Sequence, residues 1–149
     1  MQTLIIYHSG HHHNTQRVAS AMAEVLGADL KKVVEADAGL IAGYDLIGFG
    51  AGIYFGRHHN SLLNFVRNLP ALNKKVFLFS TSGMAGKYFF HKELKRILRE
   101  KNCTILAEFS CRGFDEFGPL GVFGGVNKGR PNTQDLADAR AFAEALKTS

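Results

Sequence analysis

The sequence contains few of the residues that mark special protein classes. Its 149 residues include two cysteines, Cys103 and Cys111, three prolines and no tryptophan. Two cysteines exclude a disulfide framework and a cysteine-rich zinc site. No apolar run is long enough to span a membrane, and the N-terminal segment lacks the basic start and cleavage site of a secretory signal. We therefore expect a single cytoplasmic domain, residues 1–149, with no membrane partner.

The sequence also lacks a concentrated block of charge. Lys and Arg number 18 and Asp and Glu number 13, which gives a formal charge of +5 with neutral histidines. These charges form no basic tail or run, so we expect a mildly basic globular protein that binds no nucleic acid. The hydrophobic fraction of 46% is sufficient for a packed core and argues against a disordered chain.

Glycine and histidine are the two unusual entries in the composition. Glycine accounts for 16 of the 149 residues, above the average of roughly 7%. Six of the seven histidines fall in two short windows: His8, His11, His12, His13, His58 and His59. Both windows follow apolar runs, which makes them candidates for loops at the ends of strands.

Five apolar runs are typical of buried strands. They are Thr3–Tyr7, Leu30–Val34, Asp45–Ala51, Lys75–Ser80 and Thr104–Phe109.

Amphipathic helical patterns separate these runs. One helix carries Val18 and Met22 and ends at Gly27, a second covers Ser61–Leu69, a third has Leu94 on its apolar face, and the last begins near Asn132. This alternation predicts an α/β fold, a three-layer α/β/α sandwich around a parallel sheet. Ligands of such sheets bind beyond the carboxyl ends of the strands.

The loop after the first strand contains Ser9, Asn14 and Thr15, short polar side chains that could bind an anion beside a helix N-terminus. It has no G-x-x-x-x-G-K and no G-x-G-x-x-G, which argues against a triphosphate loop and a dinucleotide fingerprint. The third strand runs into GAGIYFGRHH and the fourth into STSGMAG. Three such loops at one sheet edge suggest a phosphate-bearing aromatic cofactor.

These loops resemble those of the flavodoxin-like family, which binds FMN. The family's phosphate loop has the form Ser/Thr-x-Thr-Gly-Asn-Thr, and Ser9, Asn14 and Thr15 match it in a loop one residue longer and rich in histidine. GAGIYFGRHH and STSGMAG look like the loops on either side of the flavin ring. The resemblance implies a five-stranded parallel sheet of order 2-1-3-4-5 and a small flavodoxin with a histidine-rich loop.

The resemblance assigns cofactor-binding residues in all three loops. Those expected around the phosphate are Ser9, His11, His12, His13, Asn14 and Thr15. Those expected along the ring are Gly52, Ile53, Tyr54, Phe55 and Gly56, with Tyr54 preferred over Phe55 for stacking. Those expected on the pyrimidine side are Ser80, Thr81, Ser82, Gly83, Met84 and Gly86.

The histidine windows have three interpretations. They could be exposed loop residues, hydrogen-bond donors to the phosphate or flavin, or metal ligands. Three adjacent imidazoles rarely point to one centre, so we predict no metal site. If Arg57, His58 and His59 lie near the ring, their charge should make the reduction potential less negative as the pH falls through about 6.5, the reference histidine pKa.

The resemblance implies an electron-transfer protein that exchanges electrons with a redox partner protein or a small donor or acceptor, as a monomer or weak homodimer. We predict no catalytic residue. The alternative is an FMN-dependent quinone or NAD(P)H oxidoreductase of the same fold, with the segment 110–131 as a lid. The same segment could equally be an ordered surface loop. A third interpretation is a docking module, with cations of the helix around Lys92–Lys101 as the partner surface.

Overall fold

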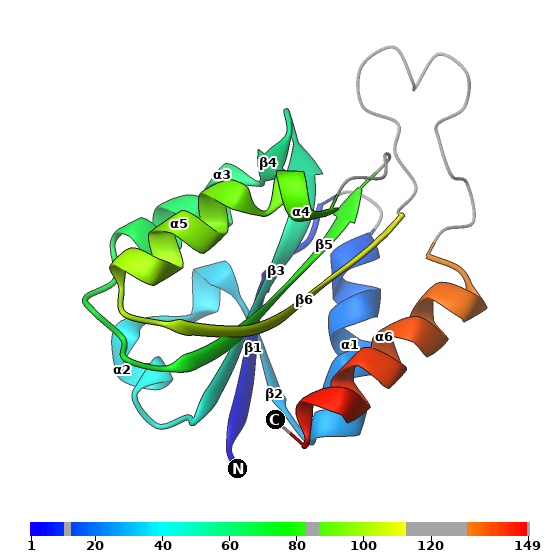
Figure 1. Ribbon diagram of the computed structural model, residues 1–149, viewed down its shortest axis with the longest axis horizontal. Coiled ribbons are helices and arrows are strands. Elements are labelled where there is room, and N and C mark those ends of the chain that lie inside the picture. The colour runs from blue at the N-terminus through cyan, green and yellow to red at the C-terminus, as the bar shows by residue number, and fades with distance from the viewer. Residues whose placement is uncertain (11–12, 83–86, 113–130, 149) are drawn as a thin grey trace.

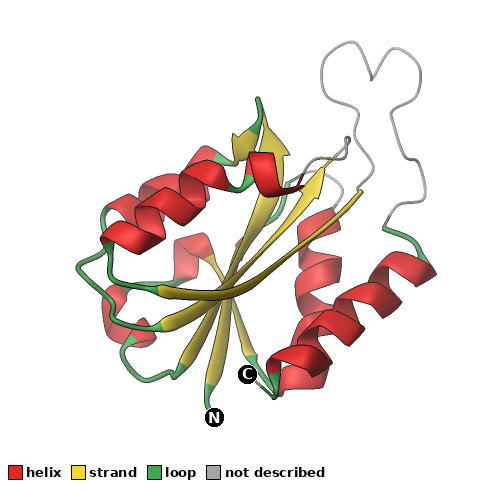
Figure 2. Cartoon of the chain, in the orientation of Figure 1, coloured by secondary structure: helices red, strands yellow, loops and turns green. Residues whose placement is uncertain are grey.

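A parallel sheet forms the centre of the molecule (Figures 1 and 2). The computed structural model describes residues 1–10, 13–82, 87–112 and 131–148. The main strands are β1 (Thr3–His8), β2 (Asp29–Lys32), β3 (Leu46–Tyr54), β5 (Lys75–Ser82) and β6 (Thr104–Arg112). They pair in parallel in the order β2-β1-β3-β5-β6. The predicted order 2-1-3-4-5 is therefore confirmed, with β5 and β6 as the fourth and fifth main strands.

Helices cover both faces of this sheet, as Figure 1 shows. One face packs against α1 (Asn14–Leu26) and α6 (Thr133–Leu146), and the other against α3 (Asn60–Arg67) and α5 (Lys92–Glu100). Successive residues of a strand point to opposite faces. Leu4 and Ile6 accordingly join the core under α3 and α5, whereas Ile5 and Tyr7 join the core under α1 and α6. The three-layer sandwich predicted from the sequence is confirmed.

The predicted caps of two helices are present. Gly27 ends α1 with φ of 62°, the left-handed conformation that favours glycine. At the start of α6, the Asn132 side chain accepts from the Asp135 amide at 2.9 Å, and the Asp135 carboxylate accepts from the Asn132 amide at 2.8 Å. This reciprocal pair satisfies two amides that helix geometry leaves without partners.

Several boundaries and small elements differ from the sequence prediction. The second strand ends at Lys32, because residues Val33–Glu35 form a 3₁₀ turn (η1) before the short helix α2 (Ala38–Ile41). The third and fifth predicted strands run further, to Tyr54 and Arg112. A short helix, α4 (Lys87–Phe90), precedes α5.

An additional strand, β4 (Arg57–His58), lies antiparallel to β3. Phe55 and Gly56 connect them as a two-residue turn in which both residues have positive φ, 52° and 81°. This turn type normally carries Asn or Gly at its first position, so Phe55 concealed the hairpin in the sequence. The stretch predicted to be a loop is therefore partly a hairpin.

The rings of Phe77 and Phe79 on β5 lie across two glycines of the neighbouring strand β3. Gly48 is opposite Phe77 and Gly50 opposite Phe79 in the strand register. A Cβ atom on Gly50 would lie 2.1 Å from the Phe79 ring, and one on Gly48 would lie 2.3 Å from the Phe77 ring. Part of the glycine excess thus makes room for aromatic rings in the core.

Within the described ranges, no helix is long and apolar enough to cross a membrane.

Candidate functional site

The three predicted ligand loops begin at one edge of the sheet. In the strand register His8 at the end of β1 is opposite Ala51 of β3, and Gly52 of β3 is opposite Thr81 of β5. The carboxyl ends of these three strands therefore lie side by side, as Figure 1 shows. This edge is where open α/β sheets bind ligands.

The first loop delivers the start of α1 to this edge. His13 precedes the helix with φ of 54°, its side chain caps no helix amide, and the first turn has no acidic residue. The Ser9 hydroxyl accepts a hydrogen bond from the Gln16 amide at 3.2 Å. The partial positive charge of this helix end is thus not offset by a carboxylate of its first turn. The donor chemistry here suits a phosphate.

Thr15 connects this loop to β5. Its hydroxyl and that of Thr81 lie 2.9 Å apart and are buried. The contact joins two segments that the sequence analysis placed at opposite ends of the cofactor. It holds the start of α1 against the end of β5.

The two histidine windows meet at the same edge. The His8 and His59 rings stack with centroids 4.0 Å apart and planes 18° apart, and Tyr54 meets His59 edge-on at 5.0 Å. A Cβ on Gly10 would lie 2.8 Å from the Tyr54 hydroxyl, so the tyrosine reaches across to the first loop.

Burial lowers the pKa of both His8 and His59, and for His8 repulsion from His59 adds to the effect. The Nδ1 atom of His59 accepts from the Ser61 amide at 3.0 Å, so this nitrogen carries no proton. A stacked pair of imidazoles with lowered pKa values therefore lies beside Tyr54. His8 was absent from the predicted site residues, although its position at the end of the first strand was visible in the sequence.

The candidate ring-stacking residues differ in exposure. Tyr54 is half-buried against His59 and Gly52, whereas Phe55 is 87% exposed at the tip of the hairpin. Gly52 and Ile53 lie half-buried on the last part of β3, and Gly56 completes the turn. Tyr54 is therefore the aromatic ring placed at the sheet edge.

His58 is buried, contrary to the expectation that it lies near the ring as a titrating charge. Its side chain is 1% exposed, its Nε2 donates to the Phe79 carbonyl at 3.0 Å, and its ring centroid lies 4.8 Å from that of His91. Burial and the neighbouring His91 lower its pKa to about 3. His58 therefore stays neutral through pH 6.5, and the predicted pH response of the potential cannot arise from it.

A buried polar chain continues beyond this histidine pair. His91 Nε2 lies 2.6 Å from the Ser80 hydroxyl, which donates to Ser110 at 3.0 Å. On the other side of the ring, Nδ1 lies 2.9 Å from the Glu108 carboxylate, which also accepts from Lys95 at 3.0 Å. A carboxylate can only accept, so His91 Nδ1 carries a proton.

This chain has the residue types of a Ser-His-acid relay, but its geometry does not serve a substrate. Ser80 and His91 are both fully buried. The Ser80 side chain, predicted to face the cofactor, instead forms hydrogen bonds with His91 and Ser110 inside the molecule. His91, Glu108 and Ser110 were missed because His91 precedes α5 whereas Glu108 and Ser110 lie on β6, and no local pattern links the two segments.

The remaining predicted residues lie as follows. Ser82 is buried at the end of β5, Asn14 is half-buried at the start of α1, and His13 is exposed. Residues His11, His12, Gly83, Met84 and Gly86 lie outside the described residues, as does the 113–130 part of the expected lid. Just before α6, the Pro131 carbonyl accepts a hydrogen bond from Arg17 of α1.

A hollow of about 210 Å³ adjoins the first loop on the β2 side. Its lining includes His8, Ser9 and His13, together with Lys32 from the end of β2. Lys32 adds a cation near the start of α1 that the sequence analysis did not single out. Among the described residues, no group of three or more His, Cys, Asp or Glu side chains could hold a metal ion.

The comparisons with known proteins agree with this architecture. A family model described as a flavodoxin domain matches residues 4–113. An uncharacterized protein of Methanocaldococcus jannaschii is 44% identical over 147 residues, and the match covers 98% of each chain. The chain belongs to the flavodoxin family.

Solved structures show the same fold at low sequence identity. A flavodoxin from the domain Archaea has a TM-score of 0.73 at 14% identity, covering 99% of this chain and 97% of that one. Flavodoxin 2 of Bacillus cereus has a TM-score of 0.74 at 18% identity, covering 99% of both. A flavodoxin, WrbA-like protein of Agrobacterium tumefaciens has a TM-score of 0.66 at 18% identity, covering 99% of this chain and 95% of that one.

Proposed function

We propose that this protein binds FMN at the carboxyl edge of the sheet and carries electrons. One observation carries the proposal: the start of α1, with no acidic residue in its first turn, and the Tyr54–His59–His8 aromatic group lie at one edge. An anion-binding element beside an aromatic surface matches a ligand with a phosphate at one end and a planar ring at the other.

The phosphate belongs at the first loop in this proposal. Ser9 and Thr15 supply hydroxyls, Asn14 supplies an amide, and the start of α1 supplies backbone N–H groups and a favourable dipole. His11, His12 and His13 would complete this shell, with Lys32 contributing long-range attraction from β2.

In this proposal the ring lies beyond the carboxyl ends of β3 and β5, between the segments that follow these strands. Tyr54 supplies an aromatic surface in reach of offset stacking, and Gly52 and Ile53 supply backbone along one edge. Thr81 and Ser82, followed by Gly83, Met84 and Gly86, would hold the opposite edge. The flavin supplies the electron chemistry when bound, and the protein binds it, orients it and limits its contact with water.

The partners of such a carrier follow from its chemistry. We propose that the protein exchanges electrons with a redox partner protein or with a small electron donor or acceptor. We propose further that it does so as a monomer or weak homodimer. A cytoplasmic location remains a prediction of the sequence.

The visible spectrum of the purified protein, reconstituted with FMN and reduced stepwise without oxygen, tests this function. We expect a yellow protein with one FMN per chain that reacts slowly with NADH, NADPH and quinones in stopped flow. Rapid turnover of a nicotinamide nucleotide and a quinone would replace the carrier by the oxidoreductase. Colourless protein that takes up no FMN would overturn the cofactor assignment.

A further inference from the structure

An open groove of about 790 Å³ lies between the β3–β4 hairpin and the helices α4 and α5. Phe55 and Arg57 line it from the hairpin, Phe89 lines it from α4, and Lys92, Arg96 and Arg99 line it from α5. Gly56, Glu93 and Glu100 complete the lining, and we call the groove formed by these nine residues the hairpin groove. None of them contributes to either apolar core.

Two exposed phenyl rings border this groove. Phe55 is 87% and Phe89 75% exposed, and both are among the large apolar side chains that the described chain leaves in water. Exposed aromatic rings beside arginines are the composition that protein interfaces favour.

The backbone at Phe55 is strained in addition. Its φ of 52° is costly for a side chain with a Cβ atom, whereas Asn or Gly would satisfy this turn. A phenylalanine here serves neither the turn nor the core. Strain retained at an exposed aromatic residue indicates a role on the surface.

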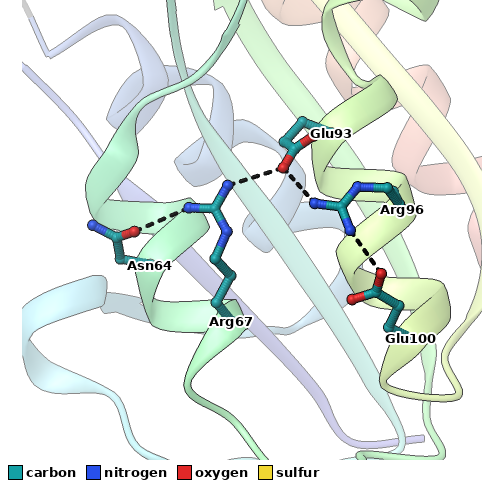
Figure 3. A network of polar contacts seen from close by, with 5 residues as sticks. All are labelled: Asn64, Arg67, Glu93, Arg96 and Glu100. Carbon is teal, nitrogen blue, oxygen red and sulfur yellow. Dashed lines mark hydrogen bonds and ion pairs between the residues drawn. The ribbon is translucent and has the colours of Figure 1, made fainter.

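The charges of the hairpin groove leave an excess of cations. Figure 3 shows Glu93 between Arg67 and Arg96, with Arg96 also reaching Glu100. The Glu93 carboxylate accepts from Arg67 at 2.9 Å and from Arg96 at 2.6 Å, and the Glu100 carboxylate accepts from Arg96 at 2.6 Å. These two arginines hold the pKa of the Glu93 carboxyl below its ordinary value. Both groove carboxylates are therefore already paired.

Arg57, Lys92 and Arg99 form no ion pair with a carboxylate in the part of the chain that the structure describes. Lys92 and Arg99 are seven residues apart on α5, which separates them by about 10 Å along the helix axis. With Arg57 on the hairpin they form an extended positive surface. The formal charge of +5 adds attraction at longer range.

The hairpin groove adjoins the candidate cofactor site. Phe55 follows Tyr54 directly, and the same hairpin places His59 against His8. A protein seated on this groove would approach the edge at which we place the flavin. Electron transfer between proteins requires such proximity.

We propose that the hairpin groove is the docking surface for an acidic electron-carrier protein, an inference that rests on the proposed function. Its cations would face carboxylates of the partner, and Phe55 and Phe89 would enter an apolar patch at the centre of the contact. A small anionic ligand fits less well, because small ligands lose most of their surface on binding, whereas both rings here stand open to solvent.

Isothermal titration calorimetry with a purified acidic plant-type [2Fe–2S] ferredoxin tests the proposal. Titrations use flavin-free and FMN-loaded protein, so that failure to bind FMN is distinguished from failure to dock. We expect one site in both forms, with affinity that falls as salt rises from 20 to 300 mM, roughly the range over which screening of exposed charges becomes strong.

Matched variants locate the site. Arg57→Glu and Arg99→Glu should each weaken ferredoxin binding by roughly tenfold, whereas Lys75→Glu should leave it unchanged. Lys75→Glu changes the charge by the same amount, but Lys75 lies at the start of β5, at the sheet edge opposite the candidate site. Phe55→Asn should also weaken binding while raising the thermal midpoint, a combination that loss of folding cannot produce.

Four results would overturn the proposal. They are no ferredoxin binding, equal weakening by Lys75→Glu, binding of NADPH at the groove in place of the ferredoxin, and self-association of the chain through the groove in sedimentation experiments.

Discussion

His58 shows how burial alters the chemistry of a residue whose type suggests a titrating loop. It is 1% exposed, and its pKa is lowered to about 3 by burial and by His91. Unfolding returns the ring to water, where its pKa is about 6.5. Between these two values the unfolded state binds a proton that the folded state does not, so stability falls as the pH falls.

We expect the free energy of unfolding to fall by about 2 kcal/mol between pH 7 and pH 5 because of this residue. Urea denaturation at both pH values measures it. His58→Gln, whose amide can still donate to Phe79, should remove most of this difference, whereas His13→Gln at an exposed position should not. His8 and His59 have lowered pKa values as well, so a smaller difference should persist. An unchanged difference in His58→Gln would contradict the assignment.

Phe55 gives a second prediction at this scale, because its backbone conformation disfavours its own side chain. Phe55→Asn should stabilise the protein by about 1 kcal/mol, since Asn adopts positive φ at lower cost. Urea denaturation measures the change. Phe89→Asn, an equally polar change at another exposed phenylalanine, should give no comparable gain. Destabilisation by Phe55→Asn would show that Phe55 supports the hairpin.

At the scale of elements, the close packing of β3 against β5 depends on two glycines. Gly50→Ala should destabilise the protein by about 1–3 kcal/mol or more, because its Cβ would enter the Phe79 ring. Gly43→Ala is the matched control, since the nearest atom to its added Cβ is 3.8 Å away. Chemical denaturation of both variants measures the difference. A partial recovery in the double variant Gly50→Ala, Phe79→Leu would show that the clash is with this ring.

The junction of the first loop with β5 makes a prediction about ligand affinity. Thr15→Val removes a hydroxyl from the proposed phosphate shell and breaks the contact with Thr81. FMN affinity should fall by roughly 10-fold or more, the factor that one hydrogen bond to a charged group contributes. The affinity for riboflavin should change little, because riboflavin has no phosphate. Fluorescence titration measures both ligands. Thr104→Val at the opposite sheet edge should change neither.

At the scale of the whole molecule, the layered architecture was predictable because it depends on patterns that extend over many residues. Apolar runs alternating with amphipathic helices define a covered parallel sheet wherever they occur. The resemblance of the three loops then selected one strand order. The convergence of the histidine windows followed from the adjacency of β1 and β3.

Local details were less predictable, for physical reasons. The hairpin was missed because Phe55 occupies a position where Asn or Gly is the usual signal. His58 is buried because its strand, β4, pairs with β3 and because its ring packs beside His91, the residue that precedes α5. Glu108 lies 17 residues from His91, on another element. Such contacts exist only after the chain has folded, so no local spacing could reveal them.

The central claim is that one sheet edge binds a ring and a phosphate together. Parallel titrations of the purified protein with FMN and riboflavin, followed by flavin fluorescence, test it most directly. The account predicts one site for FMN, with riboflavin binding roughly tenfold or more weakly because it lacks the phosphate. Equal affinity for the two flavins, or no quenching by either, would contradict it.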